Sequence, residues 1–199
     1  GRYPWGRADA YVDFDAKFIP IKAGAGVKAD VSEDKLPFPD KSFDFVYCRH
    51  TLEDIFNPFH ACREMSRVGK AGYIETPSPI AEITRGVDAA SPPYRGYIHH
   101  RWFFWVENGE LHCIQKYPAV EAMELDDQWP LLENPHYWNT YFLWKDTIGL
   151  KEHEHYRGFV LQTDYGGILK SLPAKSKQAT DEFMLRVGIG QNSVEAITF

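Results

Sequence analysis

Two aspartates stand near the ends of short apolar segments in the first part of the chain. Asp13 lies near the end of a predicted strand at residues 10–14, and Asp30 lies near the end of another at residues 26–31. In an open parallel sheet, ligands bind outside the carboxyl ends of the strands. Carboxylates at that edge can accept hydrogen bonds from ribose hydroxyls or from the exocyclic amine of adenine. A turn or a helix cap is the alternative role for either aspartate taken alone.

A second group of reactive side chains lies at residues 94–102, before a predicted hairpin. A histidine there can take a proton from a substrate hydroxyl or amine, because its unperturbed pKa of about 6.5 is near neutral pH. An arginine there can hold a carboxylate or phosphate with two hydrogen bonds. The alternative is an early strand, in which neighbouring histidines face opposite ways and cannot both enter one cleft. The candidate catalytic residues of this segment are His99 and His100, and the candidate substrate-binding residues are Arg95, Arg101 and Trp102.

The sequence contains no complete metal-binding pattern. His153 and His155 are two residues apart, which places both on one face of a strand, but no third or fourth ligand stands out. Cys48, Cys62 and Cys113 are odd in number and widely spaced, so they predict neither a disulfide framework nor a thiolate zinc site. We therefore expect no metal ion, and a reducing, cytoplasmic environment.

The elements that must position these residues alternate in the first part of the chain. Asn57 suits the N-cap of a helix, Pro58 suits its first turn, and Gly69 stands just past its end. Alternation of helical segments with short apolar strands predicts a parallel sheet covered by helices. The predicted strands occupy residues 10–14, 26–31, 43–48 and 71–76, and the predicted helix occupies residues 57–68.

The remainder of the chain loses this alternation. Asn108-Gly109 is a strong hairpin signal between two apolar segments. Aromatic residues gather in this part, where they can build a core or line an apolar cleft. Residues 80–97 have the composition of a loop, predicted strands occupy residues 102–106, 111–115, 137–144 and 156–162, and a predicted helix occupies residues 175–186.

Length and charge limit the classes of function. The chain has 199 residues, which suits a single domain. With 22 basic and 28 acidic residues, its formal charge is −6, which favours neither a nucleic-acid partner nor an anionic membrane surface. No stretch approaches the roughly 18 consecutive apolar residues of a membrane-spanning helix. We expect no nucleic acid and no membrane span, and the oligomeric state stays open.

Several segments of the first part match a known family in order and spacing. They are Lys28-Ala-Asp-Val31, the run Leu-Pro-Phe-Pro-Asp-Lys-Ser-Phe-Asp-Phe-Val-Tyr-Cys-Arg-His-Thr-Leu-Glu at residues 36–53, Asn57-Pro58, and Arg-Glu-Met-Ser-Arg-Val-Gly-Lys at residues 63–70. Over residues 8–79 the chain resembles the type 11 branch of the class I, Rossmann-like S-adenosylmethionine-dependent methyltransferases. The resemblance implies an α/β fold with a mostly parallel sheet, an antiparallel C-terminal strand and a β-hairpin insertion.

The resemblance also implies where S-adenosylmethionine binds. Asp13 matches the acid that binds the cofactor ribose, and Asp15 is the fallback two positions on. Asp30, with Val31 beside it, matches the residue that contacts adenine. These assignments agree with the role that carboxylates at strand ends can play toward a nucleoside.

The same resemblance places Cys48, Arg49 and His50 at the strand end near the methionine moiety. His50 then acts either as a base or by packing and hydrogen bonding against the cofactor. We favour the second role, because methyl transfer from an activated sulfonium needs positioning more than proton transfer.

One departure from the family concerns the start of the chain. The family begins with a strand and a glycine-rich turn, whose backbone approaches the cofactor so closely that only glycine avoids a Cβ clash. Gly1 matches the last glycine of that turn, so we expect a truncated chain that lacks the first, central strand. A complete strand within residues 1–9 would contradict this expectation.

These observations predict one methyltransferase-like domain over residues 1–199, with a cofactor-binding half at residues 1–77 and an acceptor side at residues 78–199. The expected reaction is in-line attack by an oxygen or nitrogen atom of a small-molecule or sugar-like acceptor on the methyl group. One alternative is a cofactor-free, non-catalytic binding or scaffold module. Another is a nucleotide-dependent oxidoreductase, which carries its own glycine fingerprint and a Tyr-x-x-x-Lys pair.

Overall fold

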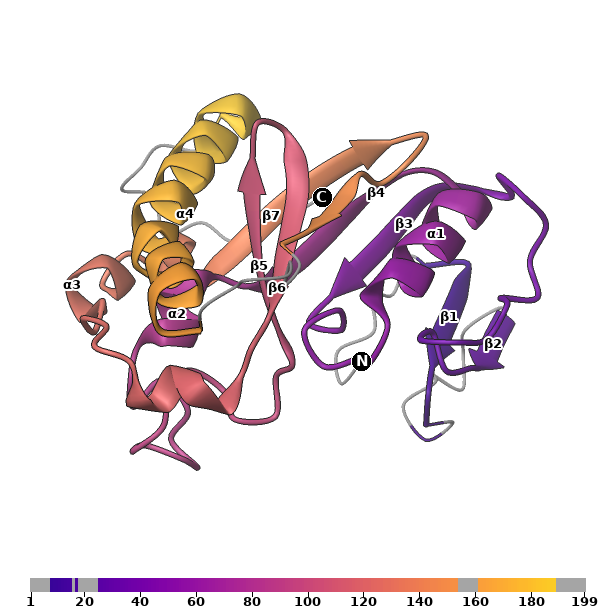
Figure 1. Ribbon diagram of the computed structural model, residues 1–199. Helices are drawn as coiled ribbons and strands as arrows, with labels where there is room; N and C mark the ends of the chain where they lie inside the picture. The colour runs from indigo at the N-terminus through magenta and orange to yellow at the C-terminus, as the bar shows by residue number, and fades with distance from the viewer. Residues whose placement is uncertain (1–7, 16, 18–24, 154–160, 189–199) are drawn as a thin grey trace.

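The computed structural model describes residues 8–15, 17, 25–153 and 161–188. Figure 1 shows the long helix α4 along one side of the strands and α1 along the other. The helices and strands are, in chain order, β1 (Ala10–Asp13), β2 (Ala25–Lys28), β3 (Phe43–Arg49), α1 (Pro58–Val68), β4 (Gly69–Pro77), α2 (Pro79–Ile83), β5 (Trp102–Glu107), β6 (Glu110–Gln115), α3 (Trp129–Leu132), β7 (Asn139–Lys145), β8 (Leu150–Glu152) and α4 (Gly166–Val187). Short 3-10 turns occupy Pro118–Ala122 and Pro135–Trp138, and a π turn occupies Leu161–Tyr165.

Helix α1 begins where the sequence predicts. The side chain of Asn57 accepts a hydrogen bond from the backbone N–H of His60 at 3.0 Å, which satisfies one of the free donors of the first turn. Cys62 and Met65 are buried on the inner face, and Phe59 packs against the same cluster. The helix is therefore fixed both by its cap and by its apolar face.

Gly69 stands just past the end of α1, as predicted. Gly69 has an extended backbone and is the first residue of β4, so it does not form a left-handed helix cap. A Cβ on Gly72, three residues further along β4, would lie 2.3 Å from the carbonyl oxygen of Val46 and 2.6 Å from the ring of Trp144. Gly72 therefore allows β4 to pass closely between its neighbours.

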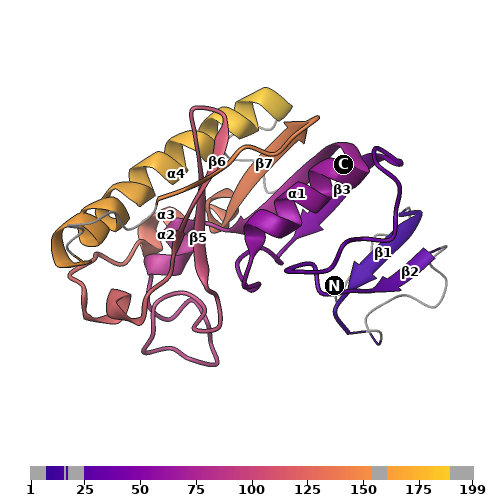
Figure 2. The same ribbon diagram turned by 45° about the vertical axis from the view of Figure 1, so that its right-hand side comes forward.

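The strands combine parallel and antiparallel pairing, as a mixed α/β fold requires. Strands β3 and β4 are parallel, and β7 pairs with β4 in the antiparallel direction. Strands β1 and β2 form a separate parallel pair. In the described part of the chain no strand joins β1 to β3 by hydrogen bonds, and both views show the β1–β2 pair beyond β3 (Figures 1 and 2). The predicted absence of a first strand concerns residues 1–9, of which only 8 and 9 are described.

Packing rather than hydrogen bonding connects the β1–β2 pair to the rest of the described fold. Val12 and Val27 of this pair join a cluster that includes Val46 of β3 and Val68 of α1. This cluster places the carboxyl ends of β1 and β2 beside α1 and the loop that precedes β3.

A hairpin of β5 and β6 packs against α4 and against the sheet β3–β4–β7, while the end of α4 also contacts β4 and β7 directly. Asn108 and Gly109 have φ angles of 53° and 77°, so they form the expected two-residue turn. One face of the hairpin, with Phe104 and Cys113, packs with α1 and β7, and the other face, with Phe103, packs under α4. Strand β8 extends this sheet by pairing with β6.

Two predicted segments of the second half have a different structure. Residues 80–97 are not wholly a loop, because Ser78 caps the short helix α2 by accepting a hydrogen bond from the N–H of Ala81. The predicted strand at residues 137–144 starts at Asn139, because Pro135 begins a 3-10 turn that includes residues 137 and 138.

The C-terminal helix is longer than predicted. Helix α4 begins at Gly166 and contains Pro173, two residue types that oppose a helix locally. Leu169 and Leu172 are fully buried in the cluster under the hairpin, and this burial outweighs the local preference. The predicted strand at residues 156–162 is wrong for its last two residues, which belong to the π turn, and its other residues lie outside the described part.

None of the described helices is long and apolar enough to cross a membrane.

Candidate functional site

The carboxyl ends of β3 and β4 bring a group of polar side chains together. Arg49 stands opposite Glu75 in the register of the two strands, and its Nε donates a hydrogen bond to Oε1 of Glu75 at 2.8 Å. The hydroxyl of Tyr73 donates to Oε2 of the same carboxylate at 2.7 Å. Burial, followed by the charge of Glu75, raises the pKa of Tyr73, so Tyr73 remains a neutral donor.

His50 lies directly after β3 in a conformation that non-glycine residues seldom adopt. Its φ is 46°, and its backbone N–H donates to the carbonyl of Glu75 at 2.9 Å. Its Nε2 lies 3.6 Å from Oε1 of Glu75, and its Nδ1 lies 3.4 Å from Oε1 of Glu53. The imidazole is therefore held between two carboxylates, while 42% of the side chain stays exposed.

Glu53 is the most unusual group of this site. It is 1% exposed, and neither of its carboxylate oxygens has a hydrogen-bond partner among the described residues. Buried carboxylates normally accept hydrogen bonds, so one that accepts none marks a place where a ligand can supply the missing donors.

Cys48 has no nucleophilic character in this setting. Burial, followed by the negative charge of Glu53, raises the pKa of its thiol to about 12. A thiol that stays protonated at neutral pH is neither a nucleophile nor a metal ligand. Cys48 therefore contributes to the wall of the site.

Asp13 and Asp30 lie together at the carboxyl edge of the β1–β2 pair. Strand β1 is parallel to β2 with Asp13 opposite Lys28, and the N–H of Ala29 donates to the carbonyl of Asp13 at 3.1 Å. One oxygen of the Asp30 carboxylate accepts the N–H of Ser32 at 2.8 Å, which fixes the side chain in the turn after β2.

The structure also shows the local contacts of Asp13 and Val31, which were predicted to bind the cofactor. Oδ1 of Asp13 accepts the N–H of Asp15 at 3.0 Å. Val31 is half-buried and packs against the clusters around α1 and the β1–β2 pair. Gly1 lies outside the described residues.

S-adenosylmethionine carries a nucleoside with ribose hydroxyls and an adenine amine, which need acceptors. Carboxylates at the ends of two neighbouring parallel strands suit these donors. The site residues present fit such a group in their chemistry, since Asp13 and Asp30 share one edge and Glu53 is buried without a partner.

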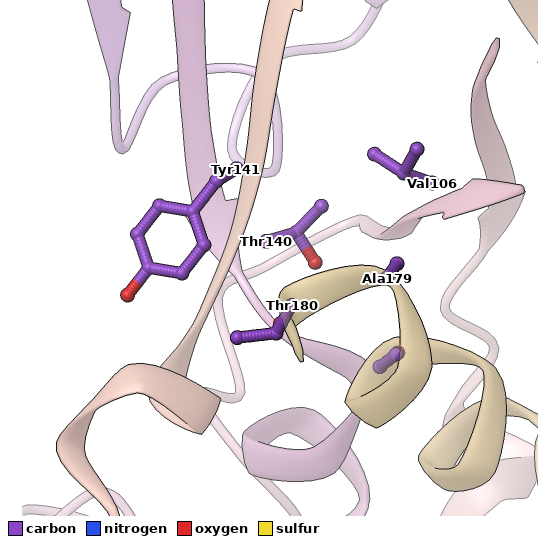
Figure 3. Close-up of a pocket in the computed structure, with 6 residues that line it drawn as sticks. Val106, Thr140, Tyr141, Ala179 and Thr180 are labelled. Carbon is purple, nitrogen blue, oxygen red and sulfur yellow. The ribbon is translucent and has the colours of Figure 1, made fainter. Parts of the chain in front are cut away.

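The pocket in Figure 3 is not a cofactor site. It lies between β5, β7 and α4, and it has no room for a water molecule. Thr140, which lines it, donates its hydroxyl to the carbonyl of Phe104 at 3.0 Å, and the ring of Tyr141 points away from it in the close-up. Its lining residues are Val106, Thr140, Tyr141, Ser176, Ala179 and Thr180.

Among the predicted acceptor-side residues, three contact other parts of the protein. The guanidinium of Arg95 is buried and donates to the carbonyls of Ile83 at 2.6 Å and Leu125 at 2.9 Å. Nε of Arg101 donates to the carbonyl of Asp54 at 2.9 Å. The indole N–H of Trp102 donates to the carbonyl of residue 55 at 3.0 Å. Arg95 thus holds the loop after α2, while Arg101 and Trp102 hold the segment after His50.

His99 and His100 do not belong to a strand. Residues 98 and 99 form a turn, and β5 begins at Trp102. In this turn Nε2 of both histidines lies 3.7 Å from Oδ1 of Asp54. The strand rule that would have separated the two side chains therefore does not apply.

A buried ion pair supports His100 from the other side. Nδ1 of His100 donates to Oε1 of Glu82 at 2.6 Å, and Nζ of Lys116 donates to Oε2 of Glu82 at 2.5 Å. Burial opposes the charged form of Glu82, but these two donors outweigh it and lower the pKa of Glu82. Burial also opposes the charged form of His100, but its hydrogen bond to Glu82 and the nearby acids raise its pKa.

None of the acids around His50 and around His100 was predicted from the sequence as a site residue. Glu75 could have been found, because it lies two residues after Tyr73 on the same face of a predicted apolar strand. A charged residue at such a position is unusual and indicates a specific partner or ligand. Glu53, Asp54 and Glu82 carry no such local signal, because only long-range contacts place them.

Tyr141 and Lys145 have the spacing of a Tyr-x-x-x-Lys pair. Both are residues of β7, where four residues span about 13 Å. Tyr141 is buried and stacks on Phe183 at 5.2 Å between ring centroids, whereas Lys145 is exposed. The two side chains therefore do not form a catalytic pair.

Comparison with known proteins gives one match. Residues 10–74 match the sequence profile described as a methyltransferase domain, type 11. No curated protein and no solved structure matches the chain significantly. The matched residues include β1, β2, β3, α1 and most of β4, and with them Asp13, Asp30 and the His50 site. Residues 10–74 thus match a methyltransferase domain, in agreement with the resemblance noted over residues 8–79.

Proposed function

We propose that this protein binds S-adenosylmethionine and transfers its methyl group to an oxygen or nitrogen atom of a small-molecule or sugar-like acceptor. The observation that carries the proposal is the methyltransferase-domain match over residues 10–74, because the polar strand ends lie within or beside it. The acceptor class is supported by the acidic net charge, which disfavours a polyanionic substrate.

The roles of the residues follow from their positions. When bound, the cofactor supplies an electrophilic methyl group on a sulfonium. Asp13 and Asp30 accept hydrogen bonds from the nucleoside and orient it. His50 positions the methionine end, because both of its ring nitrogens face carboxylates and neither is directed only to solvent. Catalysis then rests on holding donor and acceptor in line and on excluding water.

The acceptor is expected on the side of residues 78–199. Two segments of that part reach the residues that follow His50: the turn with His99 and His100, which lies near Asp54, and the start of β5 with Trp102. His100 is neutralised by Glu82, so it orients groups in this region rather than acting as a free base. The location in the cytoplasm is part of the proposal, since three unpaired cysteines suit a reducing compartment.

Equilibrium binding of S-adenosylhomocysteine tests the cofactor assignment. We expect saturable binding to the full chain, and we expect Asp30→Ala to weaken it at least about tenfold, since a lost charged hydrogen bond costs about 1.5–3 kcal/mol. Asp44→Ala is the matched control, because Asp44 is an exposed strand carboxylate that pairs with Lys70 at 2.7 Å. Equal affinity of the wild-type protein and Asp30→Ala would remove Asp30 from the site.

A cofactor-free binding or scaffold module is the second candidate function. The observation that favours it is the separation of the β1–β2 pair from β3 in the described part of the chain, together with the exposed rings of Phe45 and Tyr47 on β3. Absence of any S-adenosylhomocysteine binding by the wild-type protein would contradict the first proposal and support this one.

A further inference from the structure

Three metal-ligating side chains from two distant segments converge beside the His50 site. Nε2 of His99 and Nε2 of His100 each lie 3.7 Å from Oδ1 of Asp54, and the three ligand atoms all lie within 4.8 Å of one another. Ligands of a tetrahedral zinc ion are about 3.4 Å apart, because zinc binds nitrogen and oxygen at about 2.1 Å. Small rotations of the side chains would bring the three atoms to that spacing.

The second nitrogen of His100 is already engaged in the way that metal-binding histidines require. Its Nδ1 donates to the buried carboxylate of Glu82 at 2.6 Å, and its Nε2 lies on the side of Asp54, 3.7 Å from Oδ1, where a metal ion would take the place of a proton. Metal ligands of this type almost always donate their other ring N–H to a carboxylate or a carbonyl. Glu82 is 1% exposed, and Lys116 balances its charge, so this support is rigid.

Backbone contacts hold the two ligand segments against each other. The N–H of Arg101 donates to the carbonyl of Glu53 at 2.6 Å, and Nε of Arg101 donates to the carbonyl of Asp54 at 2.9 Å. The segment with Asp54 and the turn with the two histidines are therefore aligned before any ion arrives, which lowers the cost of binding.

The charge around the three ligands also favours a cation. Glu53 and Glu82 lie next to the cluster in the structure, and the negative charges of Glu82, Glu53 and Asp54 act on His100. Neither oxygen of the Glu53 carboxylate has a hydrogen-bond partner among the described residues. A divalent ion would offset the charges of Asp54 and of the buried Glu53, whereas the charge of Glu82 is already balanced by Lys116.

We propose that Asp54, His99 and His100 form a binding site for a divalent transition-metal ion, for which Zn²⁺ is the best fit. Two imidazoles and one carboxylate suit Zn²⁺ and related ions better than Mg²⁺ or Ca²⁺, which prefer oxygen ligands. The side chains of His99 and Asp54 are 61% and 44% exposed, so a water molecule completes the coordination from the solvent side. This inference does not rest on the proposed methyl transfer.

Metal titration of the tag-free full chain tests the proposal. Binding of Zn²⁺ is measured by competition with a chromophoric chelator, and Co²⁺ provides a spectroscopic signature through its visible d–d bands. We expect one equivalent of Zn²⁺ to bind, and we expect His99→Ala and Asp54→Asn each to weaken this binding at least about tenfold and to abolish the Co²⁺ bands. Both side chains are largely exposed, so neither variant threatens the fold.

A histidine pair elsewhere supplies the matched control. Nδ1 of His112 and Nε2 of His153 lie 2.9 Å apart, so this pair is the competing place for a metal ion. His153→Ala is expected to leave Zn²⁺ affinity within about twofold of the wild-type value. Three results would each overturn the proposal: no binding by the wild-type chain, unchanged affinity in both ligand variants, or loss of binding in His153→Ala alone.

Discussion

Nδ1 of His50 lies 3.4 Å from Oε1 of Glu53, a carboxylate that is buried and has no hydrogen-bond partner among the described residues. The contact with His50 is not a hydrogen bond, so the free energy of burying the carboxylate is only partly offset within the described part of the protein. Proteins commonly keep such groups where a ligand, rather than stability, requires them. Glu53 therefore lies beside His50, and its neighbour in sequence, Asp54, lies beside His99 and His100.

Replacement of Glu53 by methionine removes the charge at similar volume. We expect the free energy of unfolding in urea at neutral pH to rise by about 1–2 kcal/mol, because an apolar group of this size suits the buried position better. Glu82→Met is the matched control, because the Glu82 carboxylate has His100 and Lys116 as partners. That variant is expected to lose about 3–5 kcal/mol, because it leaves its partners buried without a counter-charge. A loss of stability in Glu53→Met would show that its carboxylate is paired after all.

Replacement of His50 by asparagine tests whether this residue positions the cofactor. Asparagine tolerates the left-handed backbone at φ 46°, so the loop keeps its course. We expect the affinity for S-adenosylhomocysteine to fall about tenfold, as the loss of one to two contacts of about 1 kcal/mol predicts. His60→Asn is a control, because His60 contacts the carbonyl of Asp34 instead. An affinity equal to that of the wild-type protein would favour the role of a base instead.

The ion pair of Glu64 and Arg67 makes stability depend on pH. The hydrogen bond from Arg67, aided by the N–H of Leu36, lowers the pKa of Glu64 to about 2 from its ordinary value of 4.5. The folded state therefore binds this proton less readily than the unfolded chain. The stabilisation is complete above about pH 4.5 and is lost as the pH falls toward 2.

Urea unfolding of Glu64→Gln between pH 7 and pH 2 measures this contribution. At pH 7 the variant is expected to be less stable than the wild-type protein by about 1–3 kcal/mol, and the difference should shrink as the pH falls. Glu33→Gln, at an exposed position in the turn after β2, should show no comparable pH-dependent difference. A difference that stays constant with pH would rule out the ion pair as its source.

Replacement of Gly72 by alanine tests the close approach of β4 to its neighbours. The added Cβ would meet the carbonyl oxygen of Val46 at 2.3 Å and the ring of Trp144 at 2.6 Å. Neither the backbone of Val46 nor the buried indole of Trp144 can move away easily, so we expect the free energy of unfolding to fall by about 1–3 kcal/mol.

The same change at Gly167 is the control, because nothing lies within 4 Å of a Cβ there and the residue is helical. Gly167→Ala is expected to be neutral or to stabilise by up to about 1 kcal/mol. Equal effects of the two substitutions on the melting temperature would argue against the steric explanation.

Local signals were sufficient for much of the cofactor-binding part. Asn57 caps α1, and Asn108-Gly109 forms the turn of the hairpin, because caps and tight turns depend on a few neighbouring residues. The segments between residues 10 and 74 also match a methyltransferase domain, because the match depends on the order and spacing of strand ends and loop residues along the chain.

Local signals failed where packing overrides propensity. Gly166 and Pro173 oppose helix formation, yet α4 includes both, because Leu169 and Leu172 gain more from burial beneath the hairpin. Arg95 looked like a group for binding an acceptor, and only the fold shows that its guanidinium donates to buried carbonyls.

Short-range patterns were enough to predict the polar strand ends, the first helix and the methyltransferase-domain match of residues 10–74. The convergence of His99 and His100 on Asp54, with Glu82 behind them, is visible only in the folded chain. His99 and His100 are 45 and 46 positions from Asp54, and His100 is 18 positions from Glu82, so no local periodicity relates them. Their meeting depends on a turn and on backbone hydrogen bonds that form only when β5 packs beside α1.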